Sequence, residues 1–316
     1  MRSSAAALRL SGVLCALAGA VMFAGKAIVV KLLYLYPGMS AEISLALRMS
    51  VALPFFLCLS LWAQRNDRHE ALLPGDGWKI ALIGFMGYYL ASYFDFLGLR
   101  YITATLERLI LYISPTVVLL LSVLVRKTRV TQQQMIALAI IYCGVGVAFV
   151  HDLIQNPKMS LGSTQVTLGA LLVLGSAVSY AFFLFGSGEL VKRVGALRLT
   201  ALAGLVASVC CIVQYFILQP ISHWHAILEF PQAVYELAFI NGTLCTVIPI
   251  FLIMIGISRL GAPIAAQIGM IGPIATIVLS TIFLHEQLSA WQIGGTILVI
   301  VGVFMATQVS SNEITA

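Results

Sequence analysis

The sequence predicts an all-α integral membrane protein with ten transmembrane helices, arranged as two five-helix repeats of inverted topology. Its composition, an internal repeat and the placement of its basic residues lead to this fold class. Hydrophobic residues fill 60% of the 316 positions and charged residues only 9%, and the mean hydropathy is +1.01. A soluble domain carries roughly a quarter charged residues, so this chain is expected to be solvated by lipid.

Two long stretches of the chain, 98–148 and 256–306, align without a gap at a constant offset of 158 positions. A duplicated helical membrane unit is the usual plan of a secondary transporter, whose substrate site lies near the bilayer midplane between the halves. The matched pairs are Gly98 with Gly256, Ala104 with Ala262, Pro115 with Pro273, Ser122 with Ser280, Thr131 with Ser289, Gln134 with Gln292, and Gly144 with Gly302.

Ten apolar segments of about 20 residues are each long enough to cross the bilayer as a helix. Helices are expected because unpaired backbone groups in hydrocarbon cost several kcal/mol each. The first segment continues to about Tyr36, past any cleavage site of a signal peptide, so we expect it to be retained as a span. The predicted spans are 11–34, 41–62, 78–98, 102–125, 131–150, 166–187, 198–219, 233–258, 262–284 and 289–308.

The basic residues between the spans indicate the topology. With a cytoplasmic N-terminus only Arg100 and Lys158 lie outside, as the positive-inside rule requires. The net charge of +6 therefore reflects topology rather than nucleic-acid binding. We expect a protein of a bacterial inner membrane with both termini in the cytoplasm. The odd number of spans per half inverts the second half. The residues placed inside are Arg2, Arg9, Arg65, Arg68, Lys79, Arg126, Lys127, Arg129, Lys192, Arg193, Arg198 and Arg259.

Boundary signals occupy equivalent positions in the two halves. The expected units are a first repeat at 1–151, a polar linker at 152–165 and a second repeat at 166–316. Pro115 and Pro273 fall in mid-span, where each removes a backbone hydrogen bond and should kink its helix. Thr131 and Ser289 each stand three residues before a glutamine, a spacing typical of a capping box at a helix start.

Ionisable residues inside the spans are the main functional signal, because they are costly in a bilayer and usually functional. Seven such residues lie in the first half: Lys26, Lys31, Glu42, Arg48, Asp95, Glu107 and Arg108. Lys31 and Glu42 are close enough to the outer surface to extend to it. Asp95 lies near the outer end of its span, where it could do the same, pair with Arg100, or serve as a coupling acid.

Lys26, Arg48, Glu107 and Arg108 lie deeper, ~8–12 Å from the outer end of their helices at ~1.5 Å per residue. Three of these four are basic, which favours a substrate with a carboxylate or phosphate. We expect Arg108, with Lys26 or Arg48, to bind the anionic group. Glu107 would pair with an ammonium group or carry a coupling proton. The structural alternative is a buried ion pair, such as Glu107 with Arg48.

Four tyrosines near these charges are candidates for the wall of a polar cavity, because a tyrosine can stack on a ligand and donate its hydroxyl. The alternative for each is a place in the core or the interfacial aromatic belt. The candidates are Tyr89, Tyr93, Tyr112 and Tyr180.

Several motifs in the second half resemble the drug/metabolite transporter superfamily, of the EamA type. They are the Arg-Leu-Gly-Ala run at 259–262, the span through Pro273, the His-Glu-Gln-Leu run at 285–288 and the Gln-Ile-Gly run at 292–294. His285 stands where the family usually has glycine, and Lys127-Thr128 replaces the Gly-Glu pair in the first half. The resemblance covers nearly the whole chain. It implies a ten-helix bundle with a central cavity and alternating access.

These features favour a secondary transporter that moves a small polar metabolite, amino-acid-like or carboxylate-bearing, with export favoured over import. Its expected partners are that substrate, the lipid bilayer and a proton or counter-ion, and the protein would be a monomer or a homodimer. One alternative is uptake or exchange of a larger anionic cofactor or nucleotide-like metabolite. Another is a membrane sensor or interaction protein that does not transport. The motifs of an enzyme, a metal site or a cofactor site are absent from the sequence.

Overall fold

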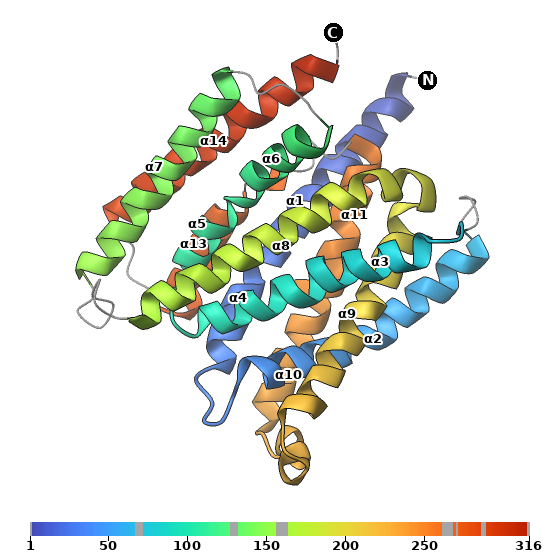
Figure 1. Cartoon of the computed structure of the whole chain (residues 1–316), viewed down its shortest axis with the longest axis vertical. Helices are drawn as coiled ribbons and strands as arrows, with labels where there is room; N and C mark the ends of the chain where they lie inside the picture. Colours follow the sequence, from blue (N-terminus) through green and yellow to red (C-terminus); the bar gives the residue numbers. More distant parts are fainter. Residues whose placement is uncertain are drawn as a thin grey trace.

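The computed structural model describes residues 2–66, 72–126, 132–155, 164–260, 268–269, 271–285 and 289–314, and every regular element among them is helical (Figure 1). In chain order the elements are α1 (Arg2–Leu33), α2 (Ala41–Asn66), α3 (Asp76–Gly84), η1 (Phe85–Leu90), α4 (Ala91–Leu99), α5 (Ala104–Leu111), α6 (Ser114–Arg126), α7 (Gln132–Gln155), α8 (Thr164–Val194), α9 (Ala196–Leu218), η3 (Ile221–Leu228), α10 (Gln232–Gly242), η4 (Thr243–Val247), α11 (Ile248–Leu260), α13 (Gly272–Phe283) and α14 (Ala290–Ile314).

The described helices confirm an all-α protein suited to a membrane. Seven helical segments are long and apolar enough to cross a bilayer: Leu10–Leu33, Ala41–Arg65, Asp76–Leu99, Leu106–Val125, Thr164–Ser187, Ala196–Leu218 and Gln232–Gly256. Two shorter apolar helices, Met135–Gly144 and Ala290–Gly302, lie within α7 and α14. The total of ten spans remains a prediction.

Two of the predicted spans contain a π-helical turn that the sequence did not indicate. In the third span, η1 joins α3 to α4; in the eighth, η4 joins α10 to α11. Phe85 and Thr243, their first residues, are 158 positions apart, which is the offset of the internal repeat. π-turns are rare and frequently occur at functional sites, so both repeats carry the same irregularity at the same place.

The fourth predicted span is interrupted rather than kinked. α5 ends at Leu111, a turn follows, and α6 begins at Ser114. Pro115 has no N–H to donate to the Leu111 carbonyl, which accepts a hydrogen bond from the Ser114 hydroxyl instead. In the second repeat α13 begins at Gly272, the counterpart of Ser114, so Pro273 also stands at a helix start. Proline is tolerated there because the first N–H groups lack intrahelical partners.

The loop before α14 contains a confirmed capping box and a strained residue. The Ser289 hydroxyl accepts from the backbone N–H of Gln292 at 3.2 Å, and the Gln292 side chain accepts from the Ser289 N–H at 3.2 Å. The equivalent prediction at Thr131 lies outside the described residues. His285 has a φ of 52°. A glycine, which the EamA-type proteins usually have at this position, would adopt this φ without strain.

The two repeats interlock through close backbone contacts at glycines. A Cβ on Gly144 would lie 2.6 Å from the Gly295 carbonyl oxygen, and one on Gly302 would lie 2.8 Å from the Ala137 carbonyl oxygen. Ala137 and Gly295 are themselves 158 positions apart, so the two contacts are reciprocal. Ala137 of α7 meets Gly302 of α14, and Gly144, further along α7, meets Gly295, which comes earlier in α14. The two helices therefore pack antiparallel (Figure 1).

A second pair of equivalent contacts joins helices of the two repeats. A Cβ on Gly98 of α4 would lie 2.9 Å from the Gly169 carbonyl oxygen of α8. Gly256 of α11, the counterpart of Gly98, is equally close to α1, where its Cβ would lie 2.9 Å from that of Ala16. The third span of each repeat therefore packs on the first span of the other.

Candidate functional site

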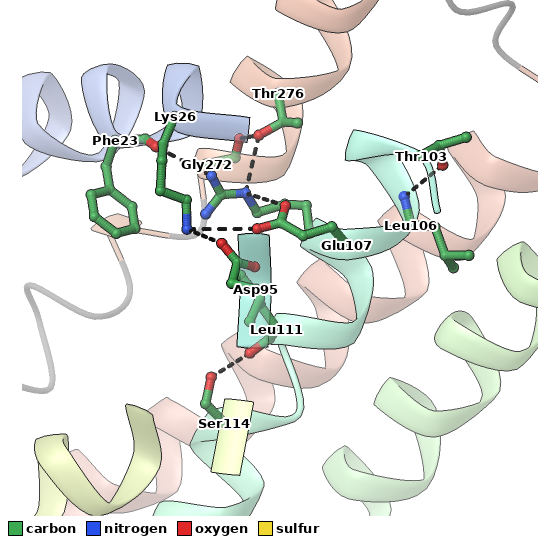
Figure 2. Close-up of polar contacts among 11 residues, drawn as sticks. Phe23, Lys26, Asp95, Thr103, Leu106, Glu107, Leu111, Ser114, Gly272 and Thr276 are labelled. Atoms are coloured by element: carbon green, nitrogen blue, oxygen red, sulfur yellow. Dashed lines mark hydrogen bonds and ion pairs between the residues drawn. The ribbon is translucent and has the colours of Figure 1, made fainter. Parts of the chain in front are cut away.

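Four charged side chains meet inside the bundle and form what we call the ionic cluster: Lys26, Asp95, Glu107 and Arg108 (Figure 2). They come from α1, α4 and α5, and Arg108 links them to α13 of the second repeat. Their exposed fractions are 5%, 1%, 0% and 9% in the same order. The cluster therefore lies in the protein interior, where charges are expensive unless they are paired.

Local sequence explains how α5 presents two members of the cluster. The Thr103 side chain caps the helix by accepting from the Leu106 backbone N–H at 3.2 Å. This cap starts the helix at Ala104 and places Glu107 in its first turn, where the helix dipole favours an acid. The helix then ends after two turns, so the cluster lies beside a discontinuous span. Secondary transporters typically build their substrate sites from such broken helices.

Lys26 joins the two acids of the cluster. Its Nζ lies 2.6 Å from Oδ2 of Asp95 and 3.8 Å from Oε1 of Glu107. Oδ1 of Asp95 and both carboxylate oxygens of Glu107 lack a hydrogen-bond donor within the described residues. Charge attraction therefore holds the two acids in place, and these three carboxylate oxygens could still accept a hydrogen bond from a further donor.

Arg108 connects the first repeat to the second. Its Nε donates to Oγ1 of Thr276 at 3.1 Å and lies 3.9 Å from Oε2 of Glu107. A terminal nitrogen donates to the Phe23 carbonyl at 3.3 Å. The Thr276 hydroxyl itself donates to the Gly272 carbonyl, which turns its lone pairs toward Arg108. With two acids and two bases, the cluster is formally neutral.

Arg48 of α2 forms no ion pair with the cluster among the described residues, although Asp95 acts on it electrostatically. Its Nη2 donates to the Ser92 hydroxyl at 2.9 Å, and its guanidinium carbon lies 4.8 Å from the centre of the Phe96 ring. The residue is 3% exposed. Its Nε has no hydrogen-bond partner, and the described part of the chain supplies no ion pair for it.

The predicted tyrosines divide between these two places. Tyr112, in the turn after α5, lies beside Gly272, where a Cβ would be 3.6 Å from its hydroxyl. Tyr180 of α8 packs on Phe183 at 5.6 Å between ring centres and interacts electrostatically with Arg108. Tyr89 and Tyr93 stack on each other along η1 and α4, with ring centres 6.4 Å apart.

The structure revises two pairings expected from the sequence. Asp95 is fully buried against Lys26, neither extended to the surface nor paired with Arg100, because α1 and α5 pack beside α4. Glu107 contacts Lys26 and Arg108, so the expected alternative pair with Arg48 is wrong. Asp95 also changes the charge balance, because it adds a second deep acid to the three bases and one acid counted from sequence.

An apolar groove between η1–α4 and α8 is distinct from the polar sites. Its volume is about 820 Å³, and Leu90, Phe94 and Phe182 are among the side chains that line it. It contains no ionisable side chain, so its surface suits hydrocarbon rather than a polar metabolite.

Apolar spans in two interlocked repeats, with a buried charge cluster at their junction, define a helical membrane transport protein. The chain belongs to the EamA-like transporter family, which it matches over residues 10–150 and 167–308, once in each repeat. It is 30% identical over 296 residues to "Uncharacterized transporter YcbK" of Bacillus subtilis (strain 168), covering 92% of each chain.

More distant similarities cover the chain to the same extent. "Uncharacterized transporter YetK" of Bacillus subtilis (strain 168) is 20% identical over 297 residues, which cover 93% of this chain and 86% of that protein. A solved crystal structure superposes with a TM-score of 0.62 at 15% identity, covering 95% of this chain and 96% of its own. At that identity the likeness concerns the fold alone.

Proposed function

We propose that this EamA-like transporter is a secondary transporter that moves a small polar metabolite, amino-acid-like or carboxylate-bearing, by alternating access between its two halves. The observation that carries the proposal is the hydrogen bond from Arg108 to Thr276, 168 residues away in the chain. It ties a buried, formally neutral charge cluster of the first repeat to α13 of the second. Opening one half against the other would break this bond and admit a substrate to the cluster.

The charge balance supports a zwitterion over a polyanion. The two acids of the cluster can receive an ammonium group when a cluster base releases them, and the deep basic residues can receive a carboxylate. A nucleotide-like polyanion would require a larger surplus of cations than the single charge that Arg48 adds to the neutral cluster, so we favour the amino-acid-like class over the larger anionic cofactor. Export remains the proposed direction because the family resemblance implies it.

Two features support ten spans in an inverted arrangement. The equivalent helices α7 and α14 pack antiparallel through reciprocal glycine contacts, as expected if the halves cross the bilayer in opposite senses. In addition, α1 begins and α14 ends at the same end of the bundle (Figure 1). Reporter tags fused to the two termini test this arrangement. Both should report from the cytoplasm, and signals from opposite faces would contradict it.

A transport assay tests the function itself. Purified protein in liposomes should exchange radiolabelled amino acids or monocarboxylates across the membrane, and Thr276→Val should slow this exchange because the Arg108 contact is lost. Thr296→Val is a matched control, since Thr296 is also buried but donates only to the Gln292 carbonyl of its own helix. Failure of the wild-type protein to move any compound of these classes would refute the proposed substrate class.

A further inference from the structure

We infer that Arg48 and Ser92 form the subsite that binds the carboxylate of the transported metabolite. This inference rests on the proposed function and assigns one chemical group of the substrate to named side chains. It starts from a difference among the three deep basic residues, because Lys26 and Arg108 form ion pairs in the ionic cluster and Arg48 forms none with the described residues.

Arg48 has no acid within ion-pair distance among the described residues. Its contacts there are a neutral hydroxyl and an aromatic ring, its Nε is buried without an acceptor, and Asp95 acts on it only at longer range. Because a buried charge is destabilising until a counter-charge meets it, an anion is the chemistry this position lacks. A guanidinium presents a planar set of donors that matches a carboxylate in two parallel hydrogen bonds.

The surroundings of Arg48 indicate the side from which a small ligand could approach. Gly242, next to the π-turn η4, packs tightly on the Arg48 backbone, where a Cβ would be 2.8 Å from its carbonyl oxygen, so we place the ligand on the α4 side of the guanidinium. Two turns of α4 and η1 carry Tyr89, Ser92 and Phe96, at a spacing that places them on one helix face. A carboxylate at Arg48 would therefore meet a hydroxyl and aromatic rings at contact distance, with Asp95 farther away.

The position of Asp95 extends the argument to an amino acid. Asp95 lies between Ser92 and Phe96 in the sequence of α4, and both of these residues contact Arg48. A cation subsite at Asp95 would thus lie on α4 next to the two residues that contact Arg48 of α2. The ammonium and carboxylate of an α-amino acid are attached to the same carbon, so a single small ligand could reach both.

The test compares each transported acid with its uncharged carboxamide. Wild-type protein in liposomes is screened with the proteinogenic L-amino acids and simple monocarboxylates, and exchange of each transported acid is measured against competition by its primary amide. Arg48→Gln should lower the preference for acid over amide roughly 10- to 100-fold, because a charge-assisted pair is lost. The KM for the amide should be unchanged, whereas a merely structural role would impair both compounds alike.

Three further variants control for folding and charge. Arg48→Lys keeps the cation and should retain most of the preference, and Ser92→Ala should reduce it less than Arg48→Gln does. Arg259→Gln makes the same chemical change at an exposed arginine that bonds Ser11, and it should leave the preference intact. All variants are first checked for a wild-type elution profile in detergent.

The outcomes separate this inference from the proposed function. If the wild-type protein transports acids and Arg48→Gln keeps its preference for them over amides, only the carboxylate subsite is overturned. If the wild-type protein transports none of the panel, the substrate class and the subsite both fail. Replacing chloride with methanesulfonate, which has no carboxylate, tests whether Arg48 binds an inorganic anion instead. Transport that requires chloride and does not distinguish acid from amide would also overturn the inference.

Discussion

The pair formed by Lys26 and Asp95 gives a quantitative test of how the ionic cluster is held together. Asp95→Asn removes the carboxylate 2.6 Å from the Lys26 ammonium and leaves Glu107, at 3.8 Å, as the nearest acid. Breaking a buried pair by removing one partner costs about 3–5 kcal/mol. Because Glu107 still compensates part of the charge, we expect the lower end of this range, about 3 kcal/mol of unfolding free energy.

The double variant decides whether the loss is electrostatic. Lys26→Met alone should also cost about 3 kcal/mol, because it leaves two buried acids with Arg108 as their sole cation in the cluster. In Lys26→Met with Asp95→Asn, both charges disappear and the cluster is again neutral. The double variant should therefore be about 2–3 kcal/mol more stable than the sum of the single losses predicts, as expected for residues in one charge network.

Unfolding in mixed detergent micelles, titrated with sodium dodecyl sulfate, gives the four free energies. A thiol-reactive fluorophore, added after the exposed Cys58 and Cys143 have been blocked, provides the signal, because Cys211 and Cys245 are free and buried in the folded protein. Glu236→Gln is a control, since Glu236 is exposed and accepts a hydrogen bond from Gln232 in the same helix, and it should change stability by less than about 0.5 kcal/mol. If the double variant loses the sum of the two single losses to within about 0.5 kcal/mol, the charge network is refuted.

Three other changes test separate parts of the structure. Glu107→Gln should abolish the dependence of accumulation on a pH gradient while exchange at equal pH continues, and retained dependence in liposomes would remove Glu107 as the coupling acid. Gly302→Ala should lower the unfolding free energy by about 1–3 kcal/mol in the same titration, because its Cβ would lie 2.8 Å from the Ala137 carbonyl oxygen. Gly294→Ala should not lower it, because the space around Gly294 is open. His285→Gly should stabilise the protein by about 1 kcal/mol by relieving a left-handed backbone, and a lower melting temperature would contradict this.

The residues of the ionic cluster could be found from sequence, but their pairing could not. Lys26, Glu107 and Arg108 stand out because a charge in an apolar span is rare and costly. Which acid meets which base depends on how helices distant in the chain pack together. Asp95 was placed near the end of its span by residue count, yet α1 and α5 enclose it, which a single helix cannot reveal.

Neutral contributors to the site were missed for a different reason. Thr276 and Ser92 are ordinary residues for a membrane helix, where hydroxyls commonly bond their own backbone, so nothing in their type signals a contact with Arg108 or Arg48. The π-turns also lack a residue signature. The helix break was only half expected, because Pro115 indicated a kink while the Ser114 hydroxyl that completes the interruption was not anticipated.

The exchange of helices between the repeats bears on how such a chain could have arisen. α4 packs on α8 and α11 packs on α1, so each half completes the hydrophobic surface of the other. A half-chain alone would leave its glycine-lined face open to lipid. A single repeat would therefore need a second copy to cover this face, and the duplicated chain supplies it within one polypeptide. The two copies differ in charge, because Lys26, Arg48, Glu107 and Arg108 all lie in the first.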